Sequence, residues 1–140
     1  ISQTFAFGAE LFNLNELQSG VALINLESKK TSLGLFKNLA LVQSITIPIG
    51  VDHITNDISK VCSLNLEESL AIRNNIDFLF NNNQHLFDGN NFLKESFFID
   101  SKFRKISKSL IFDIIKARVE EILEMIKKQL TLTDLILIQE

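Results

Sequence analysis

The chain has a single cysteine, no run of apolar residues long enough to span a membrane, and no excess of basic residues. The lone Cys62 excludes an internal disulfide, and its helical apolar surroundings predict a small buried side chain. Because no uninterrupted apolar run reaches about 18 residues, we expect no transmembrane helix, and no signal peptide is visible. The net charge is −3, so we expect no nucleic-acid partner.

Sequence motifs of metal and hydrolase chemistry are also missing. The chain contains no His-Glu-x-x-His, no cysteine cluster and no Gly-x-Ser-x-Gly. Asp52 and His53 are adjacent, with Thr55 and Asp57 close by, but Asp52 is expected to cap a helix. His85 is far away in the sequence. We therefore assign no catalytic and no metal-binding residue.

What is present suits a globular domain. Hydrophobic residues make up 46 % of the 140 residues, which is enough for one domain with a real core. The chain begins at Ile1 and not at methionine, so we expect it to be excised from a longer protein.

The first third of the chain predicts a three-stranded antiparallel sheet. A short helix over residues 1–12 and a polar loop over 13–20 are expected first. Apolar runs at 21–26, 31–36 and 39–49 predict strands, and their short links favour an antiparallel meander. Asn38 suits the second turn because asparagine tolerates positive φ.

Two helices are expected next. Asp52 is predicted to N-cap the first helix, and Asn65 with Glu68 has the spacing of a capping box for the second. The predicted buried stripe of the first helix contains Ile54, Ile58, Val61 and Cys62. The predicted apolar face of the second contains Leu66, Leu70, Ile76, Leu79 and Phe80.

The second half predicts a loop, a hairpin, a long helix and a strand. Residues 81–91 are rich in asparagine and read as a loop, and residues 92–99 and 102–106 as a hairpin around Asp100 and Ser101. Apolar residues recur on one stripe over 108–130, which predicts a helix. The β-prone run at 133–138 predicts a strand that returns to the sheet by a parallel crossover.

These elements predict an α/β fold: a three-stranded antiparallel meander plus a parallel return strand, with a small helix–hairpin subdomain inserted. We expect the sheet and first helices over residues 1–62. The outer inserted subdomain is expected over 63–106, and the long helix and return strand over 107–140.

Three stretches, in order, resemble one known family. Residues 45–58 read Ile-Thr-Ile-Pro-Ile-Gly-Val-Asp-His-Ile-Thr-Asn-Asp-Ile and resemble its I-P-[IV]-G-G-[DN]-H-[VI]-T-N-D-[IL] signature. Residues 20–36 resemble its strand–phosphate loop–strand unit. Residues 114–123, Ile-Ile-Lys-Ala-Arg-Val-Glu-Glu-Ile-Leu, resemble a run in its long helix. On these motifs the chain resembles the second large domain of FtsA, the bacterial actin-like cell-division family.

The resemblance implies an actin-like (ribonuclease H-like) fold beside a cleft for ATP. Proteins of this family polymerise as actin-like filaments and recruit the tubulin-like FtsZ through the outer subdomain. They attach to the inner membrane through a C-terminal amphipathic helix. The resemblance thus implies a non-catalytic cell-division scaffold on the cytoplasmic face of that membrane, with the membrane contact made by parts absent from this chain.

The resemblance places nucleotide-binding positions at Asn25, Thr31, Gly50 and Arg73, and the pattern there is degenerate. The family's phosphate loop is a glycine turn, because glycine lets backbone amides approach phosphate closely. Here residues 27–29 are Glu, Ser and Lys, and Asn25 replaces an acidic residue that helps to organise Mg²⁺. Only Thr31 keeps the pattern of the loop.

Further departures agree with a degenerate site. Val51 replaces the second glycine of the signature, Leu70 replaces a glutamate near the nucleoside, and Arg73 replaces a lysine. Lys29 and Lys30 could attract phosphate by charge, but two lysines on a turn are usually just solvated. We therefore expect weak or absent ATP binding, with ATP and Mg²⁺ as doubtful ligands of the full-length protein.

The long helix carries the residues implied in partner binding. The resemblance places the contact with the FtsZ C-terminal tail at Arg118 and Glu121, and a guanidinium can bind a carboxylate of an acidic peptide bidentately. The two residues are three apart, so an ion pair between them is the alternative. Two other functions stay open: an actin-like ATPase that still binds ATP, and a pilus-assembly actin-like protein.

Overall fold

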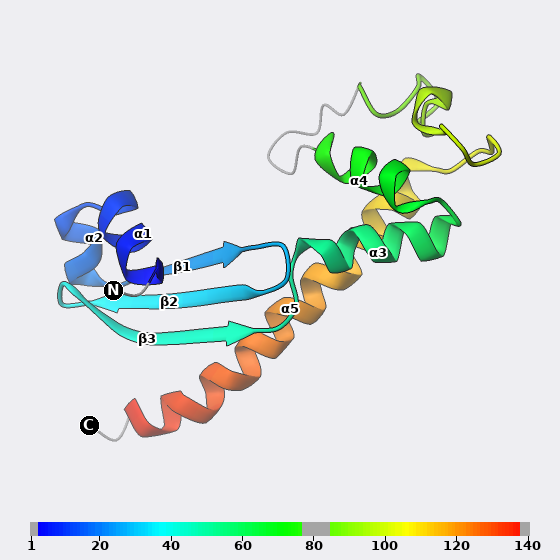
Figure 1. The fold of residues 1–140 in the computed structure, drawn as a ribbon. Coiled ribbons are helices and arrows are strands. Elements are labelled where there is room, and N and C mark those ends of the chain that lie inside the picture. The colour runs from blue at the N-terminus through cyan, green and yellow to red at the C-terminus, as the bar shows by residue number, and fades with distance from the viewer. Residues whose placement is uncertain (1–2, 77–84, 138–140) are drawn as a thin grey trace. The chain divides into compact units, whose positions relative to one another are not determined.

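The computed structural model describes residues 3–76 and 85–137, with side chains up to residue 130. The chain forms two compact units, Ile1–Val51 with Glu121–Glu140, and Asp52–Glu120. Figure 1 shows the order of their elements. This division differs from the predicted one at residues 62 and 106, because helix α3 (Val51–Cys62) belongs almost entirely to the second unit and helix α5 (Lys108–Leu137) contributes to both.

The first unit is built on the predicted antiparallel meander. Strands β1 (Val21–Leu26), β2 (Thr31–Lys37) and β3 (Ala40–Ile47) lie in the order β1-β2-β3 (Figure 1). Asn38 has φ 52° and Leu39 φ 63° in the β2–β3 turn, which confirms the prediction for Asn38. The ladder shifts register between Leu35 and Phe36.

Two helices precede the sheet. Helix α1 (Gln3–Leu11) was expected, but the predicted loop at residues 13–20 is wrong, because helix α2 (Leu14–Ser19) forms there. Asn13 and Glu16 make a reciprocal capping box, with the Asn13 amide donating to Glu16 Oε2 and the Glu16 amide donating to Asn13 Oδ1 at 2.9 Å each. This capping box stabilises a short helix that has no apolar periodicity in its sequence, so the hydrophobic pattern does not predict it.

Both faces of the sheet are covered. One face packs Leu33, Ile45 and Ile47 against Ile122 and Ile126 of α5. The other face lies against α1, where a Cβ on Gly34 would be 2.4 Å from Thr4 Cγ2 and a Cβ on Gly8 would overlap the Phe36 ring. The odd-numbered positions of β1 share this α1 face, because Leu23 pairs with Gly34.

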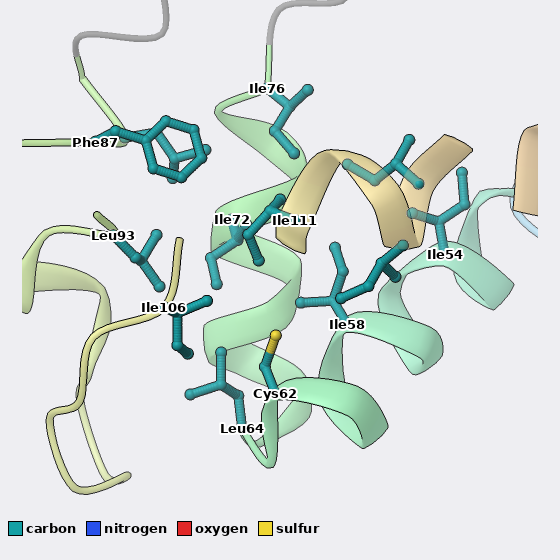
Figure 2. Packing of buried hydrophobic residues seen from close by; sticks show 13 residues of the cluster. Ile54, Ile58, Cys62, Leu64, Ile72, Ile76, Phe87, Leu93, Ile106 and Ile111 are labelled. Carbon is teal, nitrogen blue, oxygen red and sulfur yellow. The ribbon is translucent and has the colours of Figure 1, made fainter. Parts of the chain in front are cut away.

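The second unit packs α3, α4 (Leu66–Asn74) and the first part of α5 around an apolar core. Figure 2 shows Ile54, Ile58, Cys62, Ile72 and Ile111 converging from these helices. The predictions for Ile54, Ile58, Cys62 and Ile76 are confirmed. Those for Val61, Leu66 and Leu70 are wrong because these side chains are exposed, and Leu79 and Phe80 lie outside the described residues.

The helix starts are partly as predicted. The Asn65–Glu68 capping box is confirmed, with the Glu68 amide donating to Asn65 Oδ1 at 2.8 Å and the Asn65 amide to Glu68 Oε2 at 3.0 Å. Asp52 is not an N-cap, because α3 already begins at Val51. Of the predicted loop, residues 85–91 form turns and the earlier part lies outside the described residues.

The predicted hairpin at residues 92–106 is wrong. This segment holds a short 3₁₀ helix, η1 (Glu95–Phe97), and isolated bridges from Phe92 to Ser107 and from Phe87 to Leu93. The amides of residues 99–101 do not pair as a strand, because all three donate to Glu68 Oε1 at 2.8–2.9 Å. A buried carboxylate needs such donors, and it sets the path of the loop.

The predicted return strand is also wrong. Helix α5 continues through Leu137, and among residues 3–76 and 85–137 the sheet has three strands without a parallel member. The periodicity of a short apolar run such as 133–138 fits a strand and a helix equally well. Here the preceding helix continues into the run. In the described part of the chain, no helix is both long and apolar enough to cross a membrane.

Candidate functional site

The turn at residues 27–30 replaces the expected phosphate loop. It joins β1 to β2 tightly, with the Glu27 amide donating to the Lys30 carbonyl at 2.9 Å. The Glu27 carbonyl in turn accepts from the Val51 amide, also at 2.9 Å. A Cβ on Gly50 would lie 2.2 Å from the Glu27 oxygen and 2.5 Å from the Ser28 oxygen. Carbonyl oxygens of the turn therefore face the junction between β3 and α3.

Side chains of this turn add a negative charge beside a positive one. Lys30 Nζ lies 3.5 Å from Glu27 Oε2. That oxygen is buried and accepts no hydrogen bond from the described residues. The geometry makes Lys30 a counter-ion of Glu27, so the ammonium group is less available to a phosphate than a free lysine would be.

Thr31 and Asn25 lie on neighbouring strands of the same unit. Thr31 is completely buried, and its hydroxyl donates to the Ile49 carbonyl at 2.7 Å. Asn25 is half-buried on β1, opposite Ser32. The threonine that keeps the family pattern thus uses its hydroxyl to hold the chain segment leading to Gly50.

Arg73, the fourth predicted nucleotide position, belongs to the second unit. Its Nη1 lies 3.3 Å from Asp52 Oδ1 and donates to Thr55 Oγ1 at 2.9 Å. The guanidinium therefore ties α4 to the first turn of α3. Asn25, Thr31 and Gly50 lie in the first unit.

Arg118, predicted to contact a partner, binds within the second unit. Its Nε donates to Asp57 Oδ2 at 2.7 Å and its Nη2 to Asp57 Oδ1 at 2.9 Å, and both side chains are mostly buried. This bidentate pair joins α5 to α3. Sequence reasoning missed it because Asp57 is 61 positions away and reads as an ordinary helix-surface residue.

The second predicted contact residue, Glu121, lies on the same helix as Arg118. Glu121 is exposed on α5, one turn after Arg118, and Lys116 lies 3.9 Å from Glu120. Phe98 and Phe103 stack edge to face at 5.2 Å, and Arg104 donates to the Lys102 carbonyl at 3.3 Å. Within the described residues, no group of three or more His, Cys, Asp or Glu side chains could hold a metal ion.

The Arg118–Asp57 pair should stabilise the second unit measurably. Removing either partner leaves a mostly buried charge without its counter-ion, so a double-mutant cycle of Arg118→Ala and Asp57→Ala should give a coupling of about 2 kcal/mol. The matched control is the exposed pair of Lys116 and Glu120, for which we expect less than about 0.5 kcal/mol. Guanidinium unfolding of the four proteins of each cycle measures both values; equal couplings would contradict the structural role of Arg118.

Comparisons with known proteins find similarity in sequence and in structure. No protein-family model matches the chain. Over 128 residues, which are 91% of this chain and 28% of the relative, it is 27% identical to the cell division protein FtsA of Bacillus subtilis (strain 168). The crystal structure of MreB 5 of Spiroplasma citri bound to AMPPNP is similar with a TM-score of 0.60 and 19% identity, over 91% of this chain and 39% of that chain. The predicted actin-like fold and the resemblance to FtsA are therefore confirmed, for a chain that spans less than a third of this curated relative.

Proposed function

We propose that this FtsA-like chain of actin-like fold is part of a cell-division scaffold whose nucleotide site is degenerate. Similarity to FtsA along 91% of the chain supports the division role. In the same proposal the whole protein associates with itself as actin-like filaments. It lies at the cytoplasmic face of the inner membrane, through parts other than those described.

The turn at residues 27–30 is the observation that supports a degenerate nucleotide site. A phosphate cradle needs amides that point at the ligand and no Cβ in the way. Here the Glu27 amide is bonded within the turn, the Glu27 carbonyl accepts from the Val51 amide, and Glu27 Oε2 is buried beside Lys30. The negative charge of Glu27 would repel phosphate, so the turn is poorly suited to holding ATP.

The alternative is an actin-like ATPase. The MreB 5 structure is bound to AMPPNP, so a protein of similar fold can hold a nucleotide analogue. Against this function stand the glycine-free turn and Arg73, whose guanidinium already binds Asp52 and Thr55. A pilus-assembly protein of the same superfamily is less favoured, because the relative found along 91% of the chain is a division protein.

We further propose that α5 presents the binding site for the C-terminal tail of FtsZ. Replacing Arg118 would also break its pair with Asp57, so the test uses Glu121, which is exposed on the same helix. Glu121→Lys should strengthen binding of the acidic FtsZ C-terminal peptide about tenfold, because a repulsive charge contact becomes an attractive one and such a contact is worth about 1.4 kcal/mol. Fluorescence polarisation with the labelled peptide measures the affinity.

The matched control for Glu121→Lys is Glu124→Lys, which reverses the charge of another exposed glutamate on the same helix. We expect this control to bind the peptide as the unmodified chain does. The unfolding midpoint of each variant is measured alongside, so that a change in folding is not counted as a change in affinity. Equal affinities of all three proteins would contradict the proposed site.

A further inference from the structure

A groove of about 360 Å³ lies at the start of α5, within the second unit. Asn90, Asn91 and Ser107 contribute polar groups to its lining, and Phe92 and Phe112 contribute apolar surface. The volume is that of a small-molecule site. The groove residues are different from those proposed above for nucleotide and for the FtsZ tail, so the groove has no assigned role.

Backbone contacts within the second unit hold the walls of this groove together. The Lys108 amide at the start of α5 donates to the Asn91 carbonyl at 2.8 Å. Phe92 and Ser107 face one another across an isolated antiparallel bridge. Asn91 has φ 63°, a left-handed conformation that asparagine adopts more readily than most residues. A ligand would therefore enter a groove that is already formed, which lowers the entropic cost of binding.

Two lysine side chains lie over aromatic rings at this groove. Lys108 Nζ is 5.5 Å from the centroid of the Phe112 ring and 5.9 Å from that of the Phe87 ring. Lys105 Nζ is 5.6 Å from the centroid of the Phe92 ring. Phe87 is buried, and its ring centroid lies 6.2 Å from that of Phe112. Packed aromatic rings therefore hold both ammonium groups beside the groove.

Neither ammonium group is neutralised by the part of the chain that the structure describes. Lys105 and Lys108 have no ion-pair partner there, and a phenyl ring attracts a cation without cancelling its charge. Asp88, in the adjoining turn, accepts at Oδ1 from the amides of Asn90 and Phe92 at 2.8 and 3.0 Å.

The charge of the surrounding segment has the same sign. Residues 94–108 contain five basic and two acidic residues, whereas the rest of the chain contains nine basic and fifteen acidic ones. Positive charge thus gathers beside an apolar groove in a chain whose net charge is −3. Charge complementarity favours an anionic ligand there.

We propose that this groove binds an organic phosphate monoester with an aromatic or aliphatic body. The phosphate pairs with the ammonium groups of Lys105 and Lys108, and the apolar body packs on Phe92 and Phe112. A phosphate monoester carries about −1.5 to −2 charges at pH 7, which matches two lysines better than a carboxylate does. The hydroxyl of Ser109, which also lines the groove, can donate to a remaining phosphate oxygen.

Titration of phenyl phosphate into the isotope-labelled 140-residue chain, followed by NMR, tests this site. We expect saturable shifts of the Phe92 and Ser107 amides with a dissociation constant of about 1 mM, an affinity within reach of a ligand of this size. Lys108→Gln should raise that constant about tenfold, because a charged contact is lost. The matched control, Lys116→Gln, removes a lysine charge of α5 outside the groove and should leave the constant unchanged.

Further probes separate the two halves of the ligand and its source. Inorganic phosphate and benzyl alcohol should each bind about tenfold more weakly than phenyl phosphate or worse, since each lacks one half of the contacts. Vesicles that contain phosphatidic acid present the same chemistry on a lipid. Sedimentation of the chain with these vesicles, lost in Lys108→Gln, would identify a lipid as the source of the phosphate, and a chain that stays in solution would identify a soluble ester.

Three results would each overturn the proposal: no saturable shift up to about 20 mM phenyl phosphate, equal affinities of Lys108→Gln and the unmodified chain, or inorganic phosphate that binds as tightly as phenyl phosphate. Amide signals of the first unit show whether each variant is folded. Lys105→Gln changes an exposed residue and provides a second variant, for which we expect a loss of affinity similar to that of Lys108→Gln.

Discussion

Replacing Glu68 by alanine is expected to destabilise the second unit by about 4 kcal/mol, because a buried charged acceptor of several hydrogen bonds is lost. The carboxylate is completely buried and accepts five hydrogen bonds: from the amides of Ile99, Asp100 and Ser101 on Oε1, and from the Asn65 amide and the Ser101 hydroxyl on Oε2. Without it, these donors stay unpaired and the loop loses its anchor to α4.

Guanidinium unfolding followed by circular dichroism measures this loss. The matched control is Glu67→Ala, the neighbouring and exposed glutamate in the first turn of α4, for which we expect a change below about 0.5 kcal/mol. Glu68→Gln keeps the shape and one acceptor oxygen but loses the charge, so it should fall between the two. Equal midpoints for Glu67→Ala and Glu68→Ala would contradict the anchoring role.

The same carboxylate makes stability depend on pH. Burial raises the pKa of Glu68, but hydrogen bonds from Ser101, Asn65 and Asp100 outweigh it and lower the pKa from 4.5 to about 2. A lowered pKa in the folded chain means that this contribution is complete above pH 4.5 and is lost as the pH falls from 4.5 towards 2. Over that interval the thermal midpoint should fall further in the unmodified chain than in Glu68→Gln.

Gly50→Ala is expected to cost about 3 kcal/mol, because the new Cβ meets backbone atoms that cannot rotate away. It would lie 2.2 Å from the Glu27 carbonyl oxygen and 2.6 Å from the Ser28 carbonyl carbon. To make room, the turn must separate from the start of α3, and the bond from the Val51 amide to Glu27 must lengthen or break. The glycine is needed for close approach of two backbone segments.

Denaturant unfolding again gives the magnitude for Gly50→Ala. The control is Gly89→Ala, where an added Cβ meets no atom within 4 Å, and there we expect a change below about 0.5 kcal/mol. Hydrogen exchange at Val51 should also accelerate in Gly50→Ala. A Gly50→Ala protein as stable as the Gly89→Ala control would show that the turn is not packed on Gly50.

Local signals predicted much of the fold. Three apolar runs with short links predicted β1, β2 and β3, and the spacing of Asn65 and Glu68 predicted the start of α4. Local signals did not predict the segments whose structure depends on contacts between residues far apart in the sequence. Glu68 reads as a cap, but three of its donors are more than 30 positions away, and their bonds replace the expected hairpin.

The roles of the candidate residues in nucleotide and partner binding stay predictions. Resemblance alone pointed to Thr31, Gly50, Arg73 and Arg118, and each lies at a structured place. Their hydrogen-bond partners, such as Asp57 for Arg118, are set by tertiary packing and cannot be predicted from the spacing of residues in the sequence. The run at the end of the chain failed for another reason: an apolar stretch after a long helix can extend that helix as readily as begin a strand.

Calorimetric titration of Mg-ATP into the full-length protein measures whether its nucleotide site binds ATP. We expect no saturable binding in the micromolar range, because Glu27, Ser28 and Lys29 stand where an amide cradle needs glycine. Replacing these three residues by glycine in the same protein should strengthen binding relative to the unmodified sequence. Micromolar affinity of the unmodified protein for ATP would contradict the proposed loss of nucleotide binding.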